Sequence, residues 1–150
     1  MSQDGVDLDT SLGYLLKEAS SALRAAMEAV LRPLGMTVTH YSCLELLAQR
    51  PGLSNSELAR GAFVTRQSMN VLLQALERDG YVTRPAQATV GKVLPTRLTP
   101  RGRRSLEKAT IAVRSVEVRM LGGMTEAEQS AAYALLQSMI RSLRDGETDA

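Results

Sequence analysis

The sequence is poor in the side chains from which most metal and catalytic sites are built. Its 150 residues include one histidine, one cysteine and no tryptophan, and only 3% of them are aromatic. A lone cysteine excludes an internal disulfide framework and is typical of a reducing compartment. One histidine and one cysteine also fall short of the four ligands of a usual zinc site. We therefore expect no metal and no cofactor.

Long apolar runs, targeting segments and catalytic signatures are missing as well. No stretch of 18 apolar residues is present, so we expect no membrane span and no membrane partner. Residues 1–9 are acidic and polar, unlike the basic and then apolar order of a signal peptide, so we expect a cytoplasmic protein. No P-loop, Rossmann fingerprint, H-E-x-x-H or G-x-S-x-G motif occurs, and we do not expect an enzyme.

Positive charge is concentrated in the middle of the chain. Residues 54–104 contain nine Lys or Arg and three Asp or Glu, a net charge of +6, whereas the whole chain carries only +2. The rest of the chain is therefore acidic, at −4. A basic segment between acidic ends suits a polyanionic partner such as nucleic acid. A solvated basic surface with no partner is the alternative that charge alone leaves open.

Apolar side chains recur at helical spacing at both ends of the chain. In residues 9–31 they lie three or four positions apart, at Leu12, Leu16, Ala19, Leu23, Ala26 and Val30. Two more such seams lie between residues 105 and 146. The first helix has more apolar surface than one partner in a small domain usually covers. We expect residues 9–35 and 105–146 to be dimerisation helices that pack against a second copy, with packing between the two ends of one chain as the alternative.

The segment between these ends predicts a helix followed by a helix-turn-helix. The first helix is expected to begin near Thr39 and to end at Pro51-Gly52. Ser54 and Glu57 then form an S-x-x-E capping box that opens a short helix. Phe63 is the only phenylalanine, and we expect it to be buried as a plug between this short helix and the next.

Residues 65–79 are predicted to form the second helix of that motif. One face carries an apolar stripe, and the other begins with polar and basic side chains; the stripe consists of Met69, Leu72, Leu73 and Leu76. Gly80 is a natural residue to end the helix. Two short helices joined by a brief turn, the second with a polar N-terminal face, are typical of a helix-turn-helix.

After residue 80 the spacing of apolar residues is no longer helical, and the residue types become typical of a β-hairpin. Residues 81–84 and 93–98 are predicted strands, and residues 86–92, which include Gly91, form the loop between them. A hairpin directly after a helix-turn-helix is a wing. The sequence therefore predicts one domain over residues 1–150, mainly α with a small β-hairpin, in which residues 36–104 form a winged helix-turn-helix lobe.

The order of elements and five sequence fragments resemble the MarR family of bacterial transcription regulators across nearly the whole chain. The fragments are PGLS at 51–54, ELA at 57–59, VTRQSMN at 64–70, LERDGYV at 76–82 and LTPRG at 98–102. The resemblance implies a homodimer that binds pseudo-palindromic operator DNA, usually as a repressor released by a small phenolic or otherwise amphipathic molecule. One departure concerns the wing tip. Many relatives carry Asp-x-Arg-Arg there, whereas this chain has no Asp or Arg in residues 86–92 and offers Lys92 instead. Lys has less preference for groove width than Arg, so a wing near phosphate is better supported than a sequence-reading tip.

The N-terminal end of the 65–79 helix is where a recognition helix meets base edges in the major groove. Arg66 suits guanine, Gln67 or Asn70 suits adenine, and Thr65 could touch a thymine methyl group. The wing supplies phosphate or minor-groove contacts. The candidate DNA-binding residues are Ser54, Ser56, Thr65, Arg66, Gln67, Ser68, Asn70, Gln74, Arg84, Lys92 and Arg97. Helix capping without DNA is the alternative role of Ser54, Ser56, Thr65 and Ser68.

A small aromatic effector is expected where the dimer helices meet the DNA-binding lobe, as the resemblance implies. The candidate ligand residues, chosen by region, are Tyr14, His40, Tyr41 and Arg84. Cys43 is expected to be a buried, inert thiol rather than a redox sensor. Two other functions stay open: a winged-helix adaptor that binds proteins, and an architectural protein that binds DNA without sequence preference.

Overall fold

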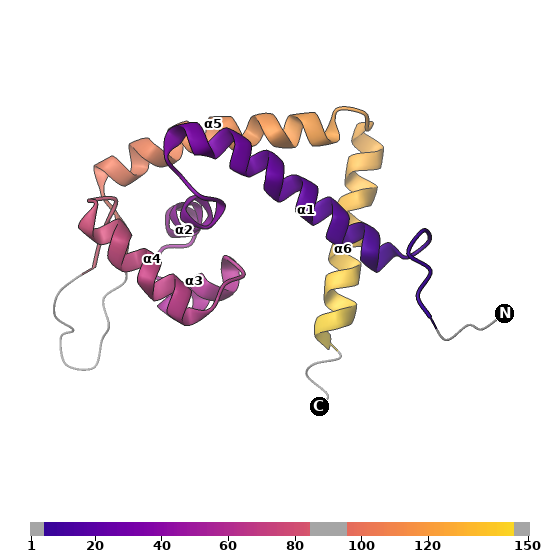
Figure 1. Cartoon of the computed structure of the whole chain (residues 1–150), viewed down its shortest axis with the longest axis horizontal. Helices are drawn as coiled ribbons and strands as arrows, with labels where there is room; N and C mark the ends of the chain where they lie inside the picture. Colours follow the sequence, from indigo (N-terminus) through magenta and orange to yellow (C-terminus); the bar gives the residue numbers. More distant parts are fainter. Residues whose placement is uncertain (1–4, 85–95, 146–150) are drawn as a thin grey trace. The chain divides into compact units, whose positions relative to one another are not determined.

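The computed structural model describes residues 5–84 and 96–145, and these fold mainly as α-helices with one antiparallel pair of strands (Figure 1). Two compact units divide the chain at residues 116 and 117. In chain order the elements are α1 (Leu12–Leu31), η1 (Arg32–Leu34), α2 (Val38–Gln49), α3 (Asn55–Gly61), α4 (Arg66–Arg78), β1 (Val82–Thr83), β2 (Arg97–Leu98), α5 (Pro100–Leu121) and α6 (Glu126–Asp145). The predicted fold class is confirmed.

Each of the first helices begins where a hydroxyl side chain caps it. Ser11, Thr37, Ser54 and Thr65 each accept a hydrogen bond from the backbone N–H three residues later, which satisfies one of the free donors of a helix start. Helix α2 therefore begins two residues earlier than expected, because Thr37 rather than Thr39 is its cap. The predicted capping box is present in full, since the Glu57 carboxylate also accepts the Ser54 N–H.

The end of α4 is set by Gly80, as the sequence predicts. Gly80 has φ 84°, a left-handed conformation that costs an L side chain but not glycine. The Tyr81 N–H donates to the Leu76 carbonyl and the Gly80 N–H to that of Glu77, which is the Schellman pattern of bonds. The chain thus turns sharply from α4 into β1.

One apolar core holds the first unit together. It draws side chains from the end of α1 and from α2, α3, α4, β1 and α5, and its fully buried members include Leu31, Leu44, Leu58, Met69, Leu73 and Val82. Because Met69, Leu73 and Leu76 are all buried, the predicted apolar stripe of α4 faces this core. The opposite face of α4 is consequently turned to solvent.

The hairpin is fastened to the start of α5 by a close backbone approach. Val82 pairs with Leu98 and Thr83 with Arg97 in the antiparallel register. A Cβ atom at Gly102 would lie 2.1 Å from the Tyr81 carbonyl oxygen, so only glycine lets α5 come this near. The Thr99 hydroxyl caps α5 by accepting the Gly102 N–H and also donates to the Gly80 carbonyl.

Large parts of α1 and α6 present apolar side chains to solvent. On α1 these include Leu12, Leu15 and Leu16, and α6 buries none of its residues. The exposed set on α6 is Tyr133, Leu135, Leu136, Ile140 and Leu143. Within residues 5–84 and 96–145, no helix is both long and apolar enough to cross a membrane.

Candidate nucleic-acid interface

The turn between α3 and α4 holds the two helices in a fixed relation. Its backbone is bonded at both sides, since the Phe63 N–H donates to the Arg60 carbonyl and the Val64 N–H to that of Ala59. Ala59 is buried, and Val64 packs against the core. Figure 1 shows α3 and α4 as neighbouring helices joined by this short turn. The exposed face of α4 is therefore presented by a well-packed support.

Four exposed side chains follow one another along that face at helical spacing. Gln67, Asn70, Val71 and Gln74 occupy positions i, i+3, i+4 and i+7, opposite the buried stripe. Val71 is absent from the residues expected on sequence grounds, although its place four residues after Gln67 would have indicated it. The face thus combines three amides, which can both donate and accept hydrogen bonds, with one apolar side chain.

Thr65 and Ser68 act first as the cap of α4. The Thr65 Oγ1 accepts the Ser68 N–H at 3.0 Å, and the two hydroxyls are hydrogen-bonded to each other at 2.9 Å. Ser54 caps α3 in the same way. The capping alternative is therefore observed for Ser54 and Thr65, whereas the Ser68 hydroxyl accepts a hydrogen bond from the Thr65 hydroxyl. Their exposed hydroxyls leave a second role toward DNA as a prediction.

Arg66 and Ser56 meet at the N-terminal end of the face. One Arg66 guanidinium nitrogen donates to the Ser56 Oγ at 3.4 Å, a contact that links α3 to α4. Arg66 itself is exposed, and this long hydrogen bond restrains it weakly. An arginine held in this way keeps most of its planar donor edge free for a carboxylate, a phosphate or a guanine.

Arg84 is tied to the α4 face from the wing side. Its guanidinium donates to the Asn70 Oδ1 at 3.3 Å and lies 3.9 Å from the Glu77 carboxylate, which also accepts the Arg84 backbone N–H. Asn70 and Arg84, fourteen residues apart in sequence, therefore belong to one surface. Part of the Arg84 charge is offset by Glu77, so Arg84 differs from the freer Arg66.

The two remaining basic residues predicted on the wing are Arg97 and Lys92. Arg97 is exposed on β2, directly opposite Thr83 of β1. Lys92 lies outside the described residues. The DNA contacts of the wing thus stay predictions. The structure describes the position of Arg97 but not that of Lys92.

Phe63 corrects one expectation from the sequence. It is not a buried plug, because its side chain is 89% exposed. Its backbone has φ 60°, the left-handed region that L residues with a Cβ enter at a cost. The ring points away from the core because the left-handed turn reverses the chain at that residue, and Ala62 and Val64 pack inward instead.

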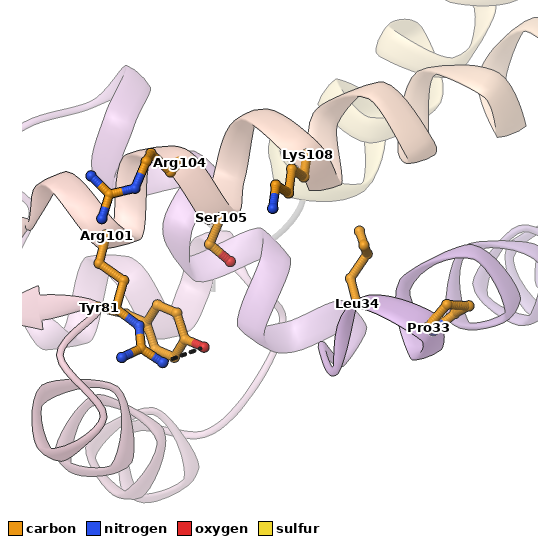
Figure 2. A pocket seen from close by; sticks show the side chains of 7 residues that line it. All are labelled: Pro33, Leu34, Tyr81, Arg101, Arg104, Ser105 and Lys108. Carbon is orange, nitrogen blue, oxygen red and sulfur yellow. Dashed lines mark hydrogen bonds between the residues drawn. The ribbon is translucent and has the colours of Figure 1, made fainter.

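A separate pocket of about 400 Å³ lies between the segment after α1 and the start of α5. Figure 2 shows Arg104, Ser105 and Lys108 on one helix and Leu34 and Pro33 on the segment opposite; Lys108 and Leu34 extend toward the space between them, whereas the Arg104 guanidinium extends toward the Arg101 end. Arg101 stacks 4.7 Å from the centre of the Tyr81 ring and donates to its hydroxyl at 3.4 Å. The pocket therefore joins three cationic groups to an aliphatic wall and an aromatic ring.

Comparison with known proteins places this architecture in a family. The model of the MarR family matches residues 34–92. HTH-type transcriptional repressor Rv2887 of Mycobacterium tuberculosis is 42% identical over 135 residues, which cover 90% of this chain and 97% of the relative.

The chain belongs to the MarR family.

Two solved structures of that mycobacterial MarR protein are similar throughout. Its complex with salicylic acid is 40% identical, with a TM-score of 0.73, and the match covers 92% of this chain and 99% of the other. Its complex with DNA is 41% identical, with a TM-score of 0.72, covering 87% and 98% of the two chains. The resemblance expected from the sequence is thus confirmed by sequence and structure alike.

The candidate ligand residues of this MarR chain lie apart from the walls of that pocket. Tyr14, His40, Tyr41 and Arg84 do not line it, and Tyr14 is exposed on α1. His40 contacts one residue that does line the pocket, because its ring meets the Tyr81 ring edge-on, with 5.3 Å between the ring centroids. The His40 Nε2 is buried and finds no hydrogen-bond partner among residues 5–84 and 96–145. Burial lowers the pKa of His40, although the Asp79 carboxylate opposes this, and the imidazole is held neutral.

Cys43 is a core residue, as expected. Its side chain is fully buried, and burial raises the pKa of the thiol to about 12. The reactive thiolate is therefore suppressed at neutral pH. Cys43 contributes apolar packing to the core rather than chemistry to a site.

Proposed function

We propose that the protein is a homodimeric, sequence-specific DNA-binding repressor of transcription that a small aromatic acid releases from its operator. The exposed face of α4 carries this proposal. Its amides at Gln67, Asn70 and Gln74 project from a rigid helix-turn-helix, with Arg66 and Arg84 beside them. Amide and guanidinium groups on the N-terminal half of such a helix suit base edges in the major groove. The relative Rv2887 is named a repressor and has been solved with DNA.

The apolar surfaces of α1 and α6 support the homodimer. Both helices leave leucine side chains exposed in the single chain, and contiguous apolar patches of this kind mark interaction sites. A second copy supplies the same patch, which is what a twofold interface requires. Two copies also present two α4 helices, and these suit half-sites of a pseudo-palindromic operator about one helical turn apart.

The pocket next to Tyr81 supports release by an aromatic acid. Arg104 and Lys108 can pair with a carboxylate, while Leu34 and Pro33 offer the aliphatic wall that an aromatic ring needs. The relative Rv2887 has been solved with salicylic acid. The His40 ring packs edge-on against the Tyr81 ring, so His40 can support this wall of the pocket, which keeps it among the candidates. Release follows when the ligand favours a spacing of the two α4 helices that no longer fits successive grooves.

Selection of genomic fragments by the purified protein tests DNA recognition. We expect enrichment of a pseudo-palindromic sequence and a steep decrease in affinity as salt rises. Arg66→Ala should remove discrimination between operator and random duplex, a loss of about 1–3 kcal/mol. Arg78→Ala, which removes the same charge from the far end of α4, should affect all duplexes alike. Binding without sequence preference would indicate an architectural protein, and no binding to duplex would indicate a protein-binding adaptor.

Titration of salicylate into the operator complex tests the effector. Release at millimolar salicylate is expected for the wild type and should weaken in Arg104→Gln and Lys108→Gln. Arg103→Gln is the matched control, since Arg103 is exposed on the same helix but does not line the pocket. No release of the wild-type complex at millimolar salicylate and related acids would contradict the effector part of the proposal alone.

A further inference from the structure

Two exposed apolar side chains lie on or next to the helix that we propose to bind DNA, Val71 on α4 itself and Phe63 in the turn that leads into it. Val71 is 60% exposed in the middle of the α4 face, between the amides of Gln67, Asn70 and Gln74. Phe63 is 89% exposed in the turn two residues before the cap of α4. Neither side chain is needed to fill the core, because the helix-turn-helix packs through other residues. Both side chains are therefore available for a contact outside the chain.

The backbone of Phe63 has a left-handed conformation that is unusual for an aromatic residue. With φ 60°, the residue occupies a conformation in which glycine is unstrained and an aromatic residue is not. The turn holds that conformation through the hydrogen bonds of Phe63 and Val64 to the end of α3. A bulky ring is thus kept at a strained, solvent-exposed position, and such positions cluster at functional sites.

The groups around these two side chains select duplex DNA as the occupant. Arg66 lies between them in sequence, and Arg84 is hydrogen-bonded to Asn70, the neighbour of Val71. Amides and guanidinium groups would be left without partners against an apolar protein surface, which is costly. Against a duplex they meet base edges and phosphates. The apolar feature of the major groove is the 5-methyl group of thymine, so apolar side chains on this face are matched by thymine.

We propose that Val71 and Phe63 read thymine methyl groups in each half-site of the operator. This inference rests on the proposed DNA-binding function and adds to it a chemical rule of specificity. The three amides and Arg66 select bases by hydrogen bonds, while Val71 and Phe63 discriminate thymine from cytosine and from uracil by contact with one methyl group.

Exchange of thymine for deoxyuridine tests the rule, because it removes the methyl group and keeps the base pair. The probe is a duplex of about 30 base pairs selected from a random pool by the wild-type protein, with each thymine replaced in turn. We expect two positions in each half-site at which the exchange lowers wild-type affinity about fourfold, the value of burying one methyl-sized group. Val71→Ala should lose the penalty at one of these positions and Phe63→Gly at the other.

Controls separate the contact from a general weakening. Val6→Ala truncates an apolar side chain that is 74% exposed and lies outside the helices, and it should keep the wild-type pattern of penalties. Circular dichroism should show unchanged helix content for all three variants, since none of these side chains is buried. If both variants show the same penalties for the thymine-to-deoxyuridine exchange as the wild type, the proposed reading of thymine methyl groups is wrong, although DNA binding itself stands. If the wild type selects no duplex, the proposed function fails first, and the rule fails with it.

Discussion

Replacement of Phe63 by glycine should make the protein more stable, although it removes the largest side chain in the helix-turn-helix turn. The backbone there has φ 60°, and an L residue in the left-handed region is destabilised by about 1–2 kcal/mol. Glycine avoids that cost but loses about 0.5–1 kcal/mol through the greater freedom of its unfolded chain. Since the Phe63 ring is 89% exposed, its removal sacrifices little buried area. The net expectation is a gain of about 0.5–1 kcal/mol in the free energy of unfolding.

Phe63→Ala provides the matched comparison. It removes the ring as glycine does but retains a Cβ, and hence the strain at φ 60°. We therefore expect Phe63→Ala to lie close to the wild type and Phe63→Gly to lie above both. The difference isolates the backbone from the side chain, because both variants expose the same surface of the turn.

Urea denaturation followed by circular dichroism measures the effect. Protein concentration must be equal across the three proteins, because the stability of the proposed dimer would depend on it. The urea concentration at the midpoint of unfolding should rise in Phe63→Gly, while the slope of the free energy against urea stays unchanged. In thermal unfolding, a gain of 1 kcal/mol corresponds to roughly 2–4 °C in Tm for a chain of this size. Equal stability of the glycine and alanine variants would refute the reasoning, as would a glycine variant weaker than the wild type.

Three further predictions concern the hairpin junction, the histidine and the thiol. Gly102→Ala should lower the free energy of unfolding by about 3 kcal/mol or more, since its Cβ would lie 2.1 Å from the Tyr81 carbonyl oxygen; Gly123→Ala, which meets nothing within 4 Å, should be tolerated in the same denaturation assay. His40 has a lowered pKa in the folded chain, so the unfolded chain takes up its proton first as the pH falls. The free energy of unfolding of the wild type, taken relative to His40→Gln, should therefore be constant above about pH 7 and fall as the pH drops below about 6.5, the unfolded value; a relative stability of the wild type that rises on acidification would contradict the lowered pKa. Cys43, with a pKa raised to about 12, should react with iodoacetamide at pH 7 only in denaturant, and rapid labelling of the native protein, seen by mass spectrometry, would show that the thiol is accessible.

Features that depend on neighbours in sequence could be predicted well. The capping box at Ser54, the end of α4 at Gly80 and the apolar stripe of α4 each involve residues within one or two helical turns. Their physical causes, namely a free backbone donor, a left-handed residue and a helical period, are local. The polar face of α4 followed directly from that stripe, because it is the opposite side of the same helix.

Features that depend on packing could not be predicted in this way. Phe63 was expected inside because it is apolar, but the backbone of the turn directs it outward. Helical spacing places Val71 on the polar face of α4, but a single valine among amides gives no sequence signal of a binding contact. Arg84 was expected to be free for phosphate, and its bonds to Asn70 and Glu77 exist only because the chain reverses between α4 and β1.

The amino-acid order by itself determined which segments become helices, where they begin and end, and which side of each is apolar, because those choices are made between residues a few positions apart. Only the tertiary structure decided that residues near 33, 81 and 101–108 enclose one pocket, and that a phenylalanine stands strained in solvent beside α4. Those outcomes depend on how closely α5 approaches β1 at Gly102 and on how the turn between α3 and α4 closes. Such contacts join residues far apart in sequence, and the energies that fix them arise only when the whole core has packed.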